Sequence, residues 1–395
     1  MLRYRCLKFL IGFSLSVGTC SQVRADVVAE RPAPDSDNVF EAIAFVNSPQ
    51  VNAPERIDSF QSQDLLIAAP ENLNPGLKLP PPPPELPPEE VSSPEPEDLE
   101  ELEVSGEPFL TLENLTVDFR RDTDNFGQIN QFIEPTAQFR LRNGERLSLK
   151  TGFNYFDATT TEPIINVPLQ VGWQGQVNQL DINVKGGLDF FNRLPVAPNF
   201  DGSIAAPIAR NVTLSGIVTW EPYKFNAKTL ENQITALRLG LNLFWQIAPQ
   251  TSLFSLVRLG AYSDGNTEQQ SFSRLERKFG RFSVATNLFN WVYREDVEAT
   301  SGYFSPPDFL VYSGEVAWQQ SLFKILQCRL AGRLGQQRLS GVWTIAYSYQ
   351  ARCTIKASAK IEADLGYEFS NVRDRATGSS AFNNQSITGQ LRINF

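Results

Sequence analysis

From Pro108 onward the chain alternates strictly between apolar and polar residues in segment after segment. In residues 237–247 every second residue is Leu, Trp or Ile, and most of the residues between them are polar. Residues 180–190 and 343–356 follow the same rule. Because successive side chains of a strand point to opposite faces, this period of two predicts strands with one apolar and one polar face.

The length of these segments decides which face meets water. Strands of soluble sandwiches are usually about 5–6 residues long, whereas these run to about 10–13 residues, as a tilted membrane-crossing strand does. Their polar rows carry too many charges for a dry core. The pattern therefore predicts an all-β fold, a transmembrane antiparallel up-and-down β-barrel with apolar rows toward lipid. The barrel must be closed, because an open edge would leave backbone groups unpaired in hydrocarbon.

The alternation predicts fourteen strands, with sixteen as the alternative count and twelve as the less favoured one. Two weaker segments, 203–209 and 268–277, would supply the extra pair. The fourteen predicted ranges are 109–121, 131–142, 145–157, 164–175, 180–191, 211–221, 234–247, 251–262, 281–293, 309–320, 325–336, 342–356, 360–370 and 385–395.

The sequence Asn143-Gly144 marks a tight turn between two predicted strands. A two-residue hairpin is the usual choice for Asn-Gly, but it would set Leu141 opposite Arg146 and mix the two rows. We therefore predict a three-residue connection, 143–145, which faces Leu141 with Leu147.

The last predicted strand ends the sequence on an aromatic residue. Apolar residues at Leu391, Ile393 and Phe395 alternate with polar ones. This resembles the C-terminal signature of bacterial outer-membrane β-barrel proteins of the porin-like kind, and by pattern the resemblance covers residues 108–395. It implies the outer membrane of a Gram-negative-type bacterium, contact with outer-membrane lipid, and recognition of Leu391, Ile393 and Phe395 as an assembly signal by the barrel-assembly machinery.

Residues 1–25 have the pattern of a secretory signal peptide. Four cations flank an apolar run at residues 9–17, and Val23 and Ala25 stand at the positions used for cleavage. The apolar run is too short to cross a membrane as a helix. We expect export and removal of this segment.

Residues 26–107 form an acidic, proline-rich segment. They hold 3 Lys or Arg against 19 Asp or Glu, and residues 80–84 are five consecutive prolines. Prolines favour extended polyproline II and like charges repel, so we predict a disordered arm in the periplasm. The alternative is an arm that binds peptidoglycan or a periplasmic protein. A proline-rich segment before a barrel is similar to the layout of cyanobacterial envelope proteins, without a shared motif.

The chain contains no histidine, which excludes Ser–His and Cys–His nucleophiles and His-ligated metals. The net charge of -9 belongs to the arm, because residues 108–395 hold 28 Lys or Arg against 25 Asp or Glu. There is no basic face for nucleic acid, and the carboxylates lack metal-ligand spacing. We expect no enzyme, no cofactor and no metal.

The polar rows carry a set of cations that would line the lumen. Such side chains raise the local anion concentration in a pore, which predicts a weak preference for anions. The alternative is an ion-pair network in which residues such as Glu362 and Asp364 neutralise the cations. The predicted lumen-lining residues are Arg140, Lys150, Lys185, Arg238, Arg329, Arg333, Arg352, Lys356, Lys360 and Arg392.

Two cysteines remain once residues 1–25 are removed, and the exported chain meets an oxidising compartment. Cys328 and Cys353 fall on lipid-facing rows of consecutive predicted strands. They sit equally far from the turn between those strands, so a cross-strand disulfide is geometrically possible. Two separate lipid-facing thiols are the alternative.

These patterns lead to two functional hypotheses. The first is a porin-like channel for passive diffusion of small hydrophilic solutes, since about fourteen strands enclose an aqueous lumen. The second is an outer-membrane anchor or scaffold whose proline-rich arm binds a periplasmic or cell-wall partner.

Overall fold

The computed structural model describes residues 108–323, 325–371 and 383–395. The predicted signal peptide and acidic arm lie outside these residues. The described residues form seventeen strands and two short helices. The strands are β1 (Leu110–Asp124), β2 (Ile129–Leu141), β3 (Arg146–Thr151), β4 (Phe153–Ala158), β5 (Thr161–Val177), β6 (Leu180–Phe191), β7 (Ala197–Ala209), β8 (Val212–Pro222), β9 (Thr235–Ala248), β10 (Thr251–Tyr262), β11 (Thr267–Phe279), β12 (Phe282–Tyr293), β13 (Phe309–Phe323), β14 (Leu326–Leu339), β15 (Val342–Lys356), β16 (Ile361–Ser370) and β17 (Asn384–Asn394). The helices are α2 (Ala227–Glu231) and α3 (Glu298–Ser301).

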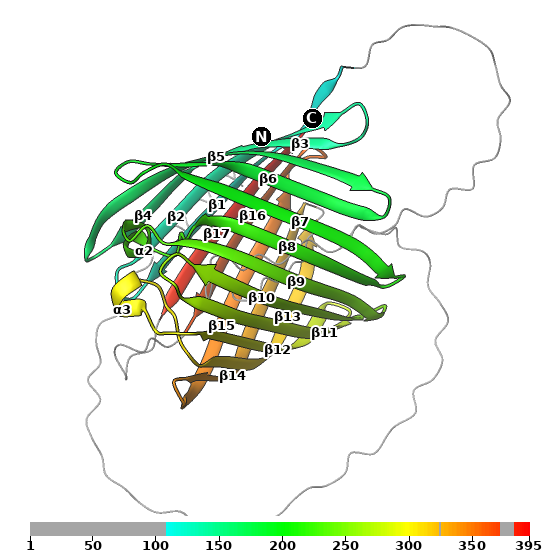
Figure 1. Ribbon diagram of the computed structural model, residues 1–395. Coiled ribbons are helices and arrows are strands. Elements are labelled where there is room, and N and C mark those ends of the chain that lie inside the picture. The colour runs from blue at the N-terminus through cyan, green and yellow to red at the C-terminus, as the bar shows by residue number, and fades with distance from the viewer. Residues whose placement is uncertain (1–107, 324, 372–382) are drawn as a thin grey trace, which may run out of the picture. The chain divides into compact units, whose positions relative to one another are not determined.

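The strands close into one antiparallel barrel in chain order, and β1 pairs with β17 to complete it (Figure 1). β3 and β4 both pair with β2 and with β5, so they are two halves of one wall strand. Gly152 separates them, and a Cβ added there would come within 3.0 Å of the carbonyl oxygen of Ile133. The wall of the described barrel therefore has sixteen strands, which confirms the predicted fold class with its alternative count.

The two strands missing from the count of fourteen are β7 and β11, which contain the weaker segments. In β11 the outward positions include Gln269, Ser271 and Ser273, while the inward row carries Glu268 and Gln270. Both faces of this stretch are polar, so the alternation that reveals the other strands is absent.

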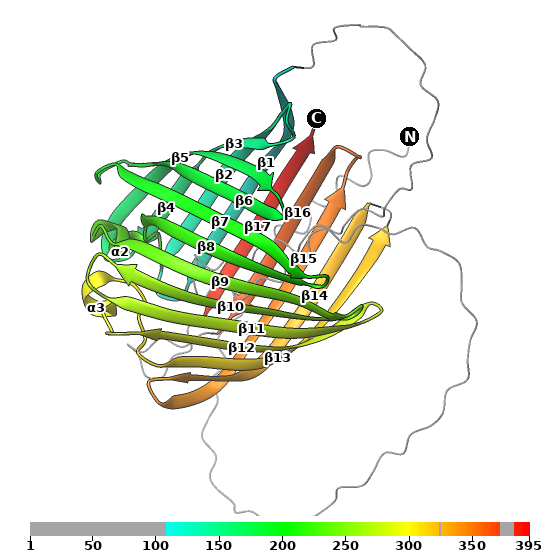
Figure 2. The same cartoon turned by 45° about the vertical axis from the view of Figure 1, so that its right-hand side comes forward.

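The two ends of the barrel differ in their connections. At the end that holds Phe395, the described connections are short turns such as residues 178–179, 210–211 and 249–250. The opposite end carries longer connections, including residues 223–234 with α2 and residues 294–308 with α3. Figure 2 shows both helices at this end, away from the tip of β17. We call the two ends the short-turn end and the helix end.

The cross-strand register assigns each strand one inward and one outward row. Outward side chains such as Leu239, at 53% exposure, and Leu365, at 63%, are apolar and stand free of the rest of the chain. Inward side chains such as Arg274, Gln270 and Glu315 are buried and polar. This apolar-out arrangement is that of a barrel solvated by lipid, with its polar atoms in the lumen.

The turn after β2 corrects the predicted register. Arg140 pairs with Arg146, and the amide of Leu141 donates to the carbonyl of Glu145 at 2.8 Å. The connection has three residues, as predicted, but it is centred on Asn143, so Leu147 faces Phe139 rather than Leu141. Gly144 takes a φ of +85°, a left-handed conformation that glycine adopts without strain and that places the turn one residue earlier.

The two cysteines face each other on the outward rows of β14 and β15. Cys328 pairs with Cys353 in the ladder, their Cα atoms are 4.1 Å apart, and the structure joins them in a disulfide. The bond lies near the short-turn end and ties together two strands that are already hydrogen-bonded neighbours.

Candidate functional site in the barrel lumen

A carboxylate shared by three arginines lies at the centre of one inner wall. Glu315 of β13 is 1% exposed. It accepts from Arg274 Nη2 at 2.9 Å, from Arg329 Nη2 at 2.8 Å and from Arg333 Nε at 2.6 Å. Each of these bonds joins two ionised groups, which makes it stronger than a neutral hydrogen bond.

Two further carboxylates complete this cluster. Arg274 also binds Glu276 at 2.7 Å, and Arg333 reaches Glu368 of β16 at 3.3 Å. With Glu315 and Arg329 the cluster holds three cations and three anions. The charges of this cluster therefore balance, and this part of the inner wall is locally neutral.

The other predicted lumen cations also lie on inward rows, mostly beside carboxylates. Lys185 stands opposite Asp201 in the ladder. The pairs are Arg140 with Glu113, Lys150 with Glu134 at 2.6 Å, Arg238 with Glu268 at 2.9 Å, Arg352 with Asp364 at 3.6 Å, Lys356 with Glu362 at 3.7 Å and Arg392 with Glu362 at 3.8 Å.

Lys360 lies at the edge of the wall. It lies in the connection before β16, which begins at Ile361. Its amide donates to the side chain of Ser358 at 3.2 Å, and its carbonyl oxygen accepts from the amide of Asn394 of β17 at 2.8 Å. Its side chain is exposed at the short-turn end.

Two long connections at the helix end meet inside the barrel. We call residues 223–234 and 294–308 together the internal bridge. Asn226 caps α2 by accepting from the amide of Thr229 at 2.8 Å. The buried side chains of Ala227 and Leu230 pack in one cluster with Phe156 of β4 and Ile164 of β5. A five-residue helix is unstable alone, so α2 depends on this cap and packing.

An ion pair anchors the internal bridge to β6. Lys224 Nζ lies 2.7 Å from Oδ1 of Asp189, a fully buried carboxylate that also accepts from Asn166 and Asn199. Burial alone would lower the pKa of Lys224, but the carboxylates of Asp189 and Glu221 raise it above its usual range. The ammonium therefore stays charged and holds the bridge to the wall.

The two halves of the bridge are joined by side chains of the first half that donate to backbone carbonyls of the second. Asn226 Nδ2 donates to Gly302 at 2.7 Å, Lys228 Nζ to Ala299 at 2.9 Å and Asn232 Nδ2 to Thr300 at 3.0 Å. The first half packs on β4 and β5, and the second connects β12 to β13, halfway round the barrel. The bridge thus crosses the lumen at the helix end.

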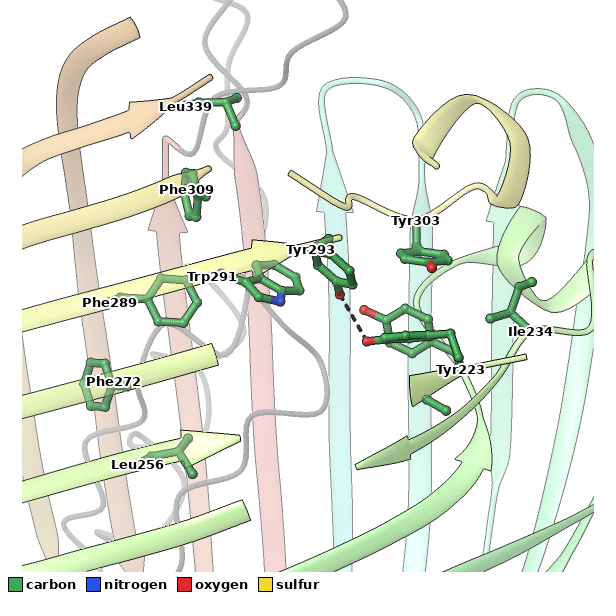
Figure 3. Close-up of a cluster of buried hydrophobic side chains, with 12 residues drawn as sticks. Tyr223, Ile234, Leu256, Phe272, Phe289, Trp291, Tyr293, Tyr303, Phe309 and Leu339 are labelled. Atoms are coloured by element: carbon green, nitrogen blue, oxygen red, sulfur yellow. Dashed lines mark hydrogen bonds between the residues drawn. The ribbon is translucent and has the colours of Figure 1, made fainter. Parts of the chain in front are cut away.

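Tyrosines pack the underside of the bridge against the wall. The rings of Tyr262 and Tyr303 stack at 5.1 Å, and Tyr223 lies 5.3 Å from Tyr303. The guanidinium of Arg238 lies 4.5 Å above the ring of Tyr223. The hydroxyls of Tyr262 and Tyr293 are hydrogen-bonded to each other at 3.1 Å. Figure 3 shows Tyr223, Tyr293 and Tyr303 close together. Burial raises the pKa of Tyr303, so its hydroxyl stays protonated.

The sequence predicted the inward rows but missed the internal bridge. Residues 223–234 and 294–308 show no alternation, and their helices are too short to give a helical period. The available signals were the Asn226 cap position and the aromatic residues Tyr293, Tyr303 and Phe304 around the second connection. Neither signal indicates that these two connections turn into the barrel.

Within residues 108–323, 325–371 and 383–395, no group of three or more Cys, Asp or Glu side chains is placed to hold a metal ion. No helix among the same residues is long and apolar enough to cross a membrane.

The chain matches no protein-family model and no curated protein. Among solved structures, a bacterial polysaccharide outer membrane secretin superposes with a TM-score of 0.61 and 11% identity, covering 72% of this chain and 98% of that one. OccK5 (OpdH) of Pseudomonas aeruginosa has a TM-score of 0.41 and 9% identity, with coverage of 72% and 98%.

The likeness to the secretin shows the fold. The chain carries a barrel of the kind found in that outer-membrane protein. Nothing in these matches supports the resemblance to cyanobacterial envelope proteins.

Proposed function

We propose that the chain is a porin-like outer-membrane channel for passive diffusion of small hydrophilic solutes, narrowed at one mouth by the internal bridge. The observation that carries this proposal is the closed sixteen-strand wall whose inward rows hold clusters of ion-paired side chains. A barrel of this size encloses more space than its own inward side chains fill. An anchor alone needs only an apolar outer surface, not a charged inner one.

We further propose that the short-turn end faces the periplasm. Outer-membrane barrels have short periplasmic turns and longer outer loops. The described chain enters β1 and leaves β17 at the short-turn end. The segment that precedes β1 would then join the barrel on the periplasmic side, and the internal bridge would lie near the outer mouth.

The ion pairs favour a weakly selective channel over a clear preference for anions. Arg329 and Arg333 share Glu315, and Arg352 lies 3.6 Å from Asp364. A cation whose field is cancelled by an adjacent carboxylate adds little to the anion concentration of a pore. This is the ion-pair alternative of the sequence analysis.

Swelling of liposomes that contain the purified protein tests passive diffusion. We expect small sugars such as arabinose and glucose to enter, and entry to slow steeply as solutes grow, because the bridge narrows one mouth. Control liposomes receive heat-unfolded protein. Swelling no faster than in those controls, for every solute, would contradict the proposal.

We propose that Leu391, Ile393 and Phe395 also serve assembly, as the resemblance implies. Leu391 and Ile393 lie on the outward row of β17, which closes against β1, where they pair with Val117 and Leu115, and Phe395 follows the end of that strand. The amide of Phe395 donates to the carbonyl of Glu113 at 3.1 Å. The closing strand thus presents an apolar outward face to the machinery that joins it to β1.

The anchor or scaffold hypothesis remains a second proposal. With the orientation proposed above, a segment preceding β1 would begin on the side where peptidoglycan and periplasmic partners lie. A channel and a tether are compatible, and conductance distinguishes a barrel that transports from one that only anchors.

A further inference from the structure

The short-turn end of the barrel carries a run of cations on one side. The connections 210–211, 249–250 and 280–281 join strands between β7 and β12, and residues 357–360 join β15 to β16. None of these four connections contains Asp or Glu. The exposed cations in these connections or near them form what we call the basic rim, which consists of Arg210, Arg277, Lys278, Arg281, Lys356 and Lys360.

Most of the basic rim has no carboxylate beside it. Among the residues that the structure describes, only Lys356 of this set forms an ion pair, at 3.7 Å from Glu362. Arg281 donates instead to the neutral amide oxygen of Gln320 at 3.2 Å. The rim therefore carries positive charge that the described wall does not balance.

The other side of the same end is electrically mixed. Glu113 forms ion pairs with Arg140 and with Arg146, the latter at 2.8 Å. Glu145, in the turn after β2, accepts from the indole of Trp173 at 2.9 Å. Unbalanced positive charge at this end is therefore concentrated on the side of the basic rim.

An excess of the opposite charge stands directly before β1. Residues 85–107 contain ten Asp or Glu and no Lys or Arg. β1 begins at Leu110, at the same end of the barrel as the basic rim. Because the acidic segment and the rim belong to one chain, each meets the other at an effective concentration of about millimolar.

The acidic segment is long enough to reach the basic rim on the far side of the lumen. A wall of sixteen strands, spaced about 4.8 Å apart and tilted by about 40°, is roughly 30 Å wide. Residues 85–107 reach at most about 75 Å when fully extended. β11, which carries Arg277 and Lys278, lies about halfway round the wall from β1. A segment that leaves β1 and reaches these cations has to pass over the lumen.

We propose that residues 85–107 bind the basic rim and so lie across the short-turn mouth of the barrel. The complementary charges supply the attraction, with carboxylates on the segment and guanidinium and ammonium groups on the rim. These charges are exposed to solvent, so salt screens them and loosens the contact. The proposal needs only the closed barrel. In a barrel that conducts, the segment narrows the mouth opposite the internal bridge.

Cross-linking of the full chain with a carbodiimide tests this contact. The reagent joins a carboxylate to a lysine amine only where the two groups touch, and mass spectrometry of the digested monomer identifies each pair. We expect links from residues 85–107 to Lys278, Lys356 or Lys360. Their yield should fall about fivefold or more at about 1 M salt, where the screening length is only about 3 Å.

The chain supplies both controls for this experiment. The pair Lys356 and Glu362, 3.7 Å apart, should link in every sample and shows that the reagent reaches the rim. Lys228 of α2, at the helix end, should form no link with residues 85–107. No link from the segment to any rim lysine, equal links to Lys228, or links that salt leaves unchanged would overturn the proposal. Links that form in detergent but vanish in phosphatidylglycerol liposomes would assign the rim to lipid phosphate and overturn it as well.

Single-channel conductance separates this contact from the proposed function. Replacing the ten carboxylates of residues 85–107 with amides keeps the length of the segment and removes its charge. The conductance should rise about twofold at about 0.1 M salt and change little at about 1 M, where the attraction is already screened. Links to the rim in a chain that never conducts would overturn the proposed function and keep the contact. A conducting chain without such links would do the reverse.

Discussion

Replacing Glu315 with glutamine is expected to turn a weakly selective channel into one that prefers anions. Glu315 is the acceptor shared by Arg274, Arg329 and Arg333, so the substitution leaves three guanidiniums with less negative charge beside them. Unbalanced charge in a confined aqueous lumen with low-dielectric walls raises the local counter-ion concentration about tenfold or more. The ratio of chloride to potassium permeability, taken from the reversal potential in a salt gradient, should rise accordingly.

The same substitution should lower stability. Removing one member of a buried ion pair costs about 3–5 kcal/mol, because the remaining charge loses its partner, and thermal unfolding in detergent should report this. Glu362→Gln is the matched control, since Glu362 pairs at 3.7 and 3.8 Å with more exposed cations. It should change both measurements far less. Equal permeability ratios for the two variants would contradict the role given to Glu315.

Releasing the internal bridge is expected to raise single-channel conductance at least twofold. The double variant Lys224→Met and Asn226→Ala removes the ion pair to Asp189, the cap of α2 and the bond to Gly302. Loss of the cap alone costs about 1 kcal/mol of helix stability. Without these anchors residues 223–234 leave the lumen part of the time, so the open current should also become noisier.

Arg294→Ala provides the control for this variant. Arg294 lies in the same bridge, but its contact with Glu295 spans 3.7 Å between exposed side chains. Exposed pairs contribute about 0–1 kcal/mol, so its conductance should match that of the unaltered chain. If the double variant conducts no better than this control, the bridge does not narrow the channel.

The predicted part of the fold is the part that obeys a local rule. Alternation follows from the pleat of a strand in contact with lipid on one side, so residues such as Leu239 and Leu241 reveal β9 without any knowledge of its neighbours. β11 escapes the rule because polar residues occupy both its faces, as at Gln269 and Gln270.

The candidate site depends on contacts that no local rule contains. Parity along β13 assigns Glu315 to the inward row, but only the register of β11, β13 and β14 brings Arg274, Arg329 and Arg333 to its carboxylate. The inward path of the internal bridge is even harder to predict from the sequence. Lys224 forms its ion pair with Asp189 because it lies on a loop that turns into the lumen. Tertiary packing, rather than the sequence of the loop itself, sets the path of this loop.

Single-channel recording of the purified protein in planar bilayers tests the central claim, a water-filled lumen, most directly. The full chain and a version without residues 26–107 are compared, so that any block by that segment is seen as a difference between the two. We predict discrete, uniform current steps in at least the shortened version, with a reversal potential near zero in a salt gradient. Folded protein that gives no steps in either version would contradict the account.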